Sequence, residues 1–309
     1  RQGRIFFGMN AHLDRLDEEH LRREVRLMEE MGIEAVRTGV GWGSIEAQEG
    51  AFDPSRLDRI LDALRGPDIE PLVLIGYTAK WATTGDPNAK DWHQWHNAPP
   101  RVDAYAAHAG RLAARYRGKV RYYEIWNEPD IGFWLGTSAQ YVDLLKAAYR
   151  AIKAADPQAQ VMNGGFSEVK RRPTFIPEVL AGARDSYDIY AFHTHGGFGN
   201  TLAAEIHTND YLKGYPKRPI WLNEAGYASV GSGSDVVQAE TLVRKIVYSA
   251  TRGWANYMWY DLRDDGTDPG DWEHNYGLVK RDYTPKPGYV AYAHLIGALA
   301  GKSADQVRV

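Results

Sequence analysis

The chain of 309 residues has the composition of a globular protein, with 44% hydrophobic and 25% charged residues and a formal net charge of −3. This charge gives no electrostatic reason to expect nucleic acid or a membrane surface as a partner. Apolar runs such as "PLVLIGY" at 71–77 are too short to cross a bilayer. The absence of cysteine excludes disulfides and thiol chemistry.

Short β-rich runs alternate with amphipathic helical patterns along the chain. The predicted strands are 4–12, 33–42, 71–79, 120–128, 159–167, 187–195, 218–226 and 254–262. Helical patterns follow them at 18–31, 54–64, 102–116, 138–155, 173–182, 202–213, 236–250 and 287–300. This alternation predicts an α/β protein with a parallel sheet, and eight units at this length predict a closed (β/α)₈ barrel. An open, doubly wound sheet is the alternative. We expect one catalytic domain over residues 1–309.

Two of the predicted strands end in a glutamate that follows an asparagine. The fourth strand reads "YYEIWNEPD" and ends at Glu128, and the seventh reads "WLNEAG" and ends at Glu224. In a (β/α)₈ enzyme the C-terminal strand ends share one site, and strands four and seven lie across the barrel from each other. Glycoside hydrolysis needs such a pair of carboxyl groups. A surface charge or a polar turn is the alternative for each glutamate alone, but two matched positions favour the catalytic interpretation.

The stretches "EIWNEPD" (124–130) and "DLRDDGTDPGDWEHNYGLVKRDYTPKPGY" (261–289) point to a known family. The chain resembles the retaining glycoside hydrolases of clan A, and within them family 39 and its relatives. Those include β-xylosidases, α-L-iduronidases and bacterial exopolysaccharide hydrolases. The resemblance implies that Glu128 is the general acid/base and Glu224 the nucleophile, and that Asn127 binds the sugar 2-hydroxyl. It also implies an oligo- or polysaccharide substrate and no cofactor.

The resemblance leaves several functional questions open. β-D-xylosides, β-D-glucosides or galactosides and α-L-arabinosides all have acceptable stereochemistry. A transglycosylase on the same site and an inactive carbohydrate-binding barrel are the alternatives to a hydrolase. We expect a secreted or extracytoplasmic protein, with a cytoplasmic one as the alternative, and the oligomeric state is open.

Three polar residues in predicted strands are candidates for the same site. Arg37 in "AVRTG" would be costly in a barrel strand unless paired, and a structural ion pair at the rim is the alternative. His193 and His195 are two residues apart and should face the same side. The clan often has Tyr at the position of His195, which leaves open whether His195 or Tyr227 orients Glu224. We expect no metal site, since no further ligand stands at a convincing spacing.

The remaining candidates are mostly aromatic. The resemblance places Trp259 of strand eight beneath the bound sugar, whereas a place in the barrel core is the alternative. Trp81, in the long loop 80–100, and Trp134, just beyond Glu128, are predicted to line sugar subsites at the active face, or to fix loops there. His12 follows strand one and either faces the pocket or fills it.

Overall fold

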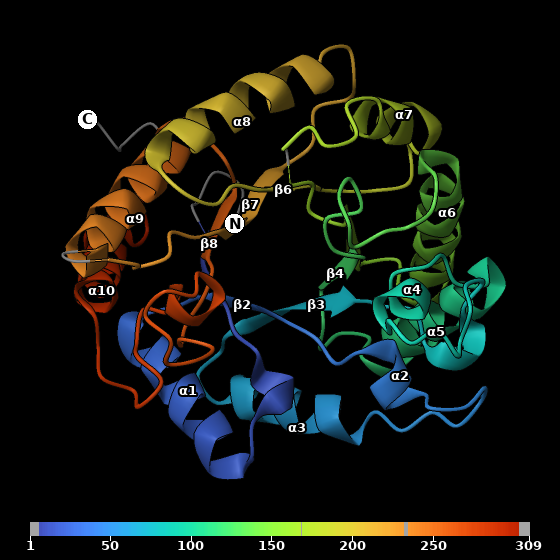
Figure 1. Ribbon diagram of the computed structural model, residues 1–309, viewed down its shortest axis with the longest axis horizontal. Helices are drawn as coiled ribbons and strands as arrows, with labels where there is room; N and C mark the ends of the chain where they lie inside the picture. The colour runs from blue at the N-terminus through green and yellow to red at the C-terminus, as the bar shows by residue number, and fades with distance from the viewer. Residues whose placement is uncertain (1–5, 168, 232–233, 303–309) are drawn as a thin grey trace.

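The structure is a computed structural model that describes residues 6–167, 169–231 and 234–302. Across these residues eight parallel strands curve into a barrel, with helices around the outside (Figure 1). The strands are β1 (Phe6–Asn10), β2 (Ala35–Thr38), β3 (Glu70–Ile75), β4 (Tyr122–Ile125), β5 (Gln160–Asn163), β6 (Tyr190–His193), β7 (Ile220–Ala225) and β8 (Asn256–Trp259). The predicted (β/α)₈ barrel is therefore confirmed.

The strands are paired in the order β5-β4-β3-β2-β1-β8-β7-β6, which leaves a seam between β5 and β6. Two isolated parallel bridges, Met162 with Ile189 and Phe166 with Phe192, close the barrel there. The side chain of Asn163 reinforces the seam. Its Nδ2 donates to the Ala191 carbonyl at 2.7 Å, and its Oδ1 accepts from the Ala191 amide at 2.8 Å. One side-chain amide thus replaces a pair of backbone bonds across the seam.

The helices cover the outer face of the barrel (Figure 1). The longer ones are α1 (Glu18–Met31), α3 (Ser55–Arg65), α5 (Val102–Arg115), α6 (Ser138–Ala155), α7 (Phe175–Gly182), α8 (Phe198–Tyr211), α9 (Ser234–Thr251) and α10 (Pro287–Leu299). Short helical turns occur in the loops: α2 (Trp42–Ile45), α4 (His93–His96), η1 (Leu13–Arg15), η2 (Lys80–Ala82) and η3 (Glu273–Asn275). No helix in the described ranges is both long and apolar enough to cross a membrane.

Local sequence explains why these helices begin and end where they do. Thr137 and Gln140 form a capping box at the start of α6. Leu144, Leu145 and Ile152 recur at helical spacing on its buried face. The predicted bounds agree with the structure to within a few residues, and the largest difference is at α8, which begins at Phe198 and not at 202.

The strands are buried on both faces, as expected for a parallel sheet covered by helices. A small apolar cluster fills the inside of the barrel, and a larger core lies between the strands and the helices. The inner cluster consists of Ala35, Leu72, Met162, Ile189, Ala191, Trp221 and Met258. The buried polar residues Arg37, Glu124 and Glu224 stand in the C-terminal halves of their strands.

Candidate active site

A left-handed turn places Glu128 beyond the end of β4. Trp126 and Glu128 have φ angles of 74° and 42°. The Glu128 amide donates to the Gly164 carbonyl at 2.7 Å. In a regular strand Asn127 and Glu128 would point to opposite faces. The left-handed turn instead lets both side chains reach the same space, at a cost of roughly 1–3 kcal/mol per strained residue.

In β7, a register shift turns the side chain of Glu224 toward the inside of the barrel. His193 pairs with Glu224, and the β6–β7 and β7–β8 ladders both shift in register near this position. The shift lets neighbouring side chains face the barrel together. Asn223 Nδ2 donates to Glu124 Oε1 at 2.8 Å, while the carboxylate of Glu224 accepts from Arg37.

Arg37 connects the two halves of the site from the middle of the barrel. Its Nη1 donates to Glu224 Oε2 at 2.7 Å, and its Nη2 donates to Asn127 Oδ1 at 2.6 Å. Its Nε donates to Glu124 Oε2 at 2.6 Å, and Nη1 also reaches Asn10 Oδ1 at 3.1 Å. Arg37 therefore lies inside the barrel and not at its rim. Burial opposes its charge, but Glu124 and Glu224 outweigh this and raise the pKa of Arg37 further.

Each histidine contacts one of the two glutamates. His193 Nδ1 lies 2.9 Å from Glu128 Oε1, and His195 Nε2 lies 2.9 Å from Glu224 Oε1. His193 packs against the backbone of Gly165, where a Cβ atom would lie 2.0 Å from the imidazole Nε2. Only glycine can occupy that position beneath the ring. Within the described residues the Tyr227 side chain makes no hydrogen bond to Glu224, so His195 orients this carboxylate.

The two carboxyl groups are close but differ in protonation. Burial and the nearby charge of Glu224 raise the pKa of Glu128 to about 8. Burial would also raise the pKa of Glu224, but His193, Arg37 and the hydrogen bond from His195 outweigh it and hold this pKa well below its ordinary value. Burial lowers the pKa of His193 to about 4, so His193 is neutral near pH 7. Arg37 is then the permanent charge that keeps Glu224 ionised.

The separation of the carboxyl groups limits the chemistry. His193 Nδ1 lies 3.8 Å from Glu224 Oε2 as well as 2.9 Å from Glu128 Oε1. The ligand atoms of these three residues all lie within 4.8 Å of one another. That spacing fits the roughly 5–5.5 Å of retaining glycosidases and is too short for the roughly 6.5–9.5 Å of inverting ones.

Two predicted aromatic residues are not where a sugar could contact them. Trp259 has no exposed surface, and its Nε1 donates to the Tyr276 carbonyl at 3.2 Å. Trp134 is 2% exposed and packs edge-on against Trp126 and Tyr141. The predictions of a sugar floor at Trp259 and of a rim position at Trp134 are therefore corrected, because both indoles are enclosed by the core.

The other predicted residues lie nearer the surface. Trp81 is half-buried and fixes its loop by donating to the Glu46 carbonyl at 2.7 Å. Trp92, in the same loop, is 50% exposed. His12 contacts the Tyr260 hydroxyl at 3.3 Å, and Tyr260 in turn packs edge-on against His195. Tyr260, the residue after Trp259, thus connects His12 to the carboxylates.

Among the residues that the structure describes, two groups of side chains have donors close enough to hold a metal ion: His12 with Asp261 and Asp265, and His193 with the two glutamates. In the first group Arg15 lies 3.7 Å from Asp265 Oδ1 and supplies a competing positive charge. In the second group the donors already bind Arg37 and one another. Retaining hydrolysis needs no metal, and the absence of a metal site stays a prediction.

Sequence reasoning missed Glu124 and Asn10, which complete the site. Glu124 has no exposed surface and binds both Arg37 and Asn223. It stands in the quoted run "EIWNEPD", four residues before Glu128, so β4 and the turn after it carry two inward acids. The signal that could have identified Glu124 was a charged residue in the middle of an otherwise aromatic strand.

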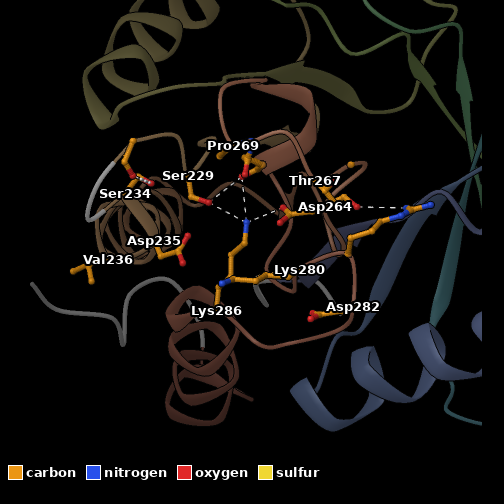
Figure 2. A pocket seen from close by; sticks show the side chains of 14 residues that line it. Ser229, Ser234, Asp235, Val236, Asp264, Thr267, Pro269, Lys280, Asp282 and Lys286 are labelled. Carbon is orange, nitrogen blue, oxygen red and sulfur yellow. Dashed lines mark hydrogen bonds and ion pairs between the residues drawn. The ribbon is translucent and has the colours of Figure 1, made fainter.

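A cavity of about 640 Å³ opens between the loops after β7 and β8 (Figure 2). Its lining includes Ser229, Asp264 and Lys286 and the first residues of α9, but neither glutamate. This cavity is therefore separate from the two carboxyl groups inside the barrel.

Comparison with known proteins identifies the family. The model of glycosyl hydrolases family 39 matches residues 6–180, which is more than half of the chain. The chain belongs to glycoside hydrolase family 39. The match includes Glu128 and Arg37 but ends before β6, so the positions of His193, His195 and Glu224 rest on the structure.

Similar proteins include a β-xylosidase from Geobacillus stearothermophilus, 28% identical over 120 residues, which are 34% of this chain and 23% of that protein. The β-galactosidase BbgII of Bifidobacterium bifidum is 29% identical over 143 residues, which are 41% of this chain and 20% of that protein. These alignments span about a quarter or less of the relatives' length.

Solved structures share the fold over nearly the whole chain. A family 39 glycoside hydrolase from Bacteroides cellulosilyticus WH2 has a TM-score of 0.78 at 22% identity, covering 96% of this chain and 64% of that one. A monomeric β-xylosidase from Caulobacter crescentus CB15 has a TM-score of 0.76 at 21% identity, and the match covers 95% of this chain and 67% of that one. At this sequence identity the structural likeness supports the barrel fold but does not identify a substrate.

Proposed function

We propose that this family 39 glycoside hydrolase is a retaining O-glycosidase that works by double displacement. The observation that carries the proposal is the pair Glu128 and Glu224, whose nearest oxygens lie within 4.8 Å. At that distance no room remains for a water molecule between the second carboxylate and the anomeric carbon. The second carboxylate must then attack the sugar itself.

The charges around the two glutamates assign their roles. Glu224 is ionised beside Arg37 and attacks the anomeric carbon. Glu128 is protonated because of its burial and the neighbouring charge, and it gives its proton to the departing oxygen. A glycosyl ester on Glu224 results. Glu128, now a carboxylate, takes a proton from a water molecule as the water oxygen attacks the anomeric carbon, and the bond between that carbon and the Glu224 oxygen breaks and releases the carboxylate.

Neighbouring residues support both steps. Asn127 is held by Arg37 and faces the site, where its amide can bind the sugar 2-hydroxyl. His193 is neutral and can share a proton with Glu128 without adding charge. His195 donates to Glu224 and fixes the direction of the attacking oxygen, and the charge of Glu224 raises the pKa of His195 despite its burial.

We further propose a substrate with a β-D-type or α-L-arabinoside linkage, within an oligo- or polysaccharide. The β-xylosidase and β-galactosidase relatives support this stereochemistry. Trp92 is 50% exposed in the loop after β3, and its ring offers a stacking surface for units beyond the cleaved bond.

The stereochemical outcome tests the proposal. The enzyme is incubated with a panel of aryl glycosides, and ¹H NMR identifies the anomer of the first-formed sugar. Net retention is the expected result, and transfer to an added sugar would show the transglycosylase alternative. An inverted anomer would exclude double displacement, and no turnover across aryl glycosides and polysaccharides would favour the carbohydrate-binding alternative.

A further inference from the structure

A buried lysine lies directly behind the proposed nucleophile. Lys245 belongs to α9 and has no exposed surface. Its Nζ donates to the Thr194 carbonyl at 2.9 Å and approaches the Gly226 carbonyl at 3.4 Å. Thr194 precedes His195, and Gly226 follows Glu224 by two residues. The lysine therefore contacts the backbone of the two segments that form the His195–Glu224 pair.

These segments are where the strand ladder is irregular. The register between β6 and β7 shifts next to His193, so regular pairing does not fix the position of Glu224. Beyond the shift, the Thr194 amide donates to the Glu224 carbonyl at 3.0 Å, and the Gly196 amide donates to the Gly226 carbonyl at 2.8 Å. Lys245 adds a donor to the carbonyls on the same stretch, and so ties the end of β6 to the end of β7.

The surroundings of Lys245 differ from those of the other buried lysine near the site. Lys286 is 3% exposed and has a carboxylate, Asp264 Oδ1, at 2.7 Å, together with the Ser229 hydroxyl at 2.9 Å (Figure 2). Lys245 forms no ion pair with any described residue, and its hydrogen-bond partners are two backbone carbonyls. Burial lowers the pKa of Lys245 to about 7.

An amine buried without a carboxylate costs stability, and leucine or methionine could fill the same space. Fixing the core therefore does not require a lysine here. What the amine provides is a pair of directed bonds to carbonyls beside His195 and Glu224. A displacement of about 1 Å at a reacting group can cost on the order of 100-fold in rate.

We propose that Lys245 is a positioning residue that holds the His195–Glu224 pair in its reactive geometry by bridging the carbonyls of Thr194 and Gly226. The inference rests on the proposed role of Glu224 as nucleophile. Lys245 acts through the backbone and does not touch the sugar, so its loss should slow the attack and leave substrate binding nearly unchanged.

Lys245→Met is the first test, because it removes the donor and keeps the length of the side chain. We expect kcat to fall about 10- to 100-fold while KM changes less than about twofold. The rate of trapping by a 2-deoxy-2-fluoro glycoside should fall in parallel. Lys153→Met is the control at the opposite end of the barrel: Lys153 Nζ also donates to a backbone carbonyl, that of Ala159 just before β5, and it pairs in addition with Asp188 Oδ2 at 3.1 Å. It should keep the wild-type kcat.

Chemical rescue separates positioning from a loss of packing. The chain contains no cysteine, so Lys245→Cys introduces a single thiol. Alkylating it with 2-bromoethylamine in the unfolded state, then refolding, restores an amine of nearly lysine length. Alkylating it with iodoacetamide restores only a shorter, neutral amide. We expect the amine to recover most of kcat and the amide to recover little, a comparison that also holds if Lys245→Met does not fold.

The outcomes distinguish this inference from the proposed function. If wild-type enzyme is labelled on Glu224 but folded Lys245→Met has wild-type kcat, the positioning role is wrong. It is equally wrong if Lys153→Met loses as much activity, or if both alkylated proteins have the same activity. If the wild-type enzyme is labelled on another residue, the proposed nucleophile is wrong instead.

Discussion

The ends of β4 and β7 present almost the same residues in opposite electrostatic surroundings. Both carry Asn followed by Glu, and both depart from regular strand geometry there. Glu128 has a neutral imidazole as its hydrogen-bond partner. Glu224 has a guanidinium at 2.7 Å and a second imidazole at 2.9 Å. The shared Asn-Glu sequence therefore does not distinguish the proposed acid from the proposed nucleophile. The proposed roles follow from the partners: Arg37 of β2 and His195, just beyond β6, bind Glu224, whereas Glu128 has the neutral His193 as its partner.

The largest expected effect comes from removing the charged member of the pair. Glu224→Ala should lower kcat by at least about 10⁴-fold on every substrate, because no other group can form the glycosyl intermediate. Added azide should attack from the vacated side and give a glycosyl azide of inverted configuration. Product NMR checks this, and a retained azide from this variant would reverse the two assignments.

Removing the neutral member should have a smaller effect that depends on the substrate. Glu128→Ala should lower kcat by about 10²–10⁴-fold for a poor leaving group and much less for an activated aryl glycoside. In wild-type enzyme, activity should fall as pH rises past about 8, where Glu128 loses its proton. The variant should lack this alkaline decline, and azide should yield a retained product. An unchanged decline, measured where the protein stays folded, would identify another acid.

The effect of the Arg37 charge on Glu224 can be weakened by one substitution and strengthened by another. Arg37→Lys should lose part of the contact with Glu224, raise the pKa of Glu224 and move the acid side of the pH profile upward, with kcat lower by about 10- to 100-fold. Glu124→Gln should lower the pKa of Glu224 and move the acid side of the pH profile downward, because Arg37 then has one fewer carboxylate to share its charge with. Profiles of kcat/KM against pH for both variants provide the measurement. A shift in the same direction for both would contradict this balance.

A separate effect is expected on stability, and it should have opposite signs at the two positions. The raised pKa of Glu128 means that ionisation destabilises the folded state as pH rises from about 4.5 towards 8. Glu128→Gln should therefore increase the free energy of unfolding by ~1–3 kcal/mol at pH 8 and little at pH 5. Glu224→Gln removes an ionised partner of Arg37 and should decrease it by ~3–5 kcal/mol. Urea unfolding at both pH values would show whether the signs differ.

Much of this arrangement follows from the sequence, and the exceptions have physical reasons. The eight strands and both glutamates were predicted from periodicity and strand order. The structure groups Arg37, His193 and His195 around these glutamates. Trp259 and Trp134 were misplaced, since neither the pattern of a strand nor a place in the loop after one shows whether an aromatic ring meets solvent or the core. Lys245 was missed because α9 carries it to backbone atoms, and no sequence pattern marks such a contact.

The seam between β5 and β6 bears on how firmly the acid is held. Glu128 and Gly165 lie on one side of it and His193 on the other, so any widening there separates the imidazole from the carboxyl group it bonds. The side-chain amide of Asn163, which bonds Ala191 across the seam, thus also holds the two sides of this contact together. Beside the two backbone bridges of this seam, it should add to the free energy of local opening, and amide hydrogen exchange at Ala191 should report how often the barrel opens next to the proposed acid.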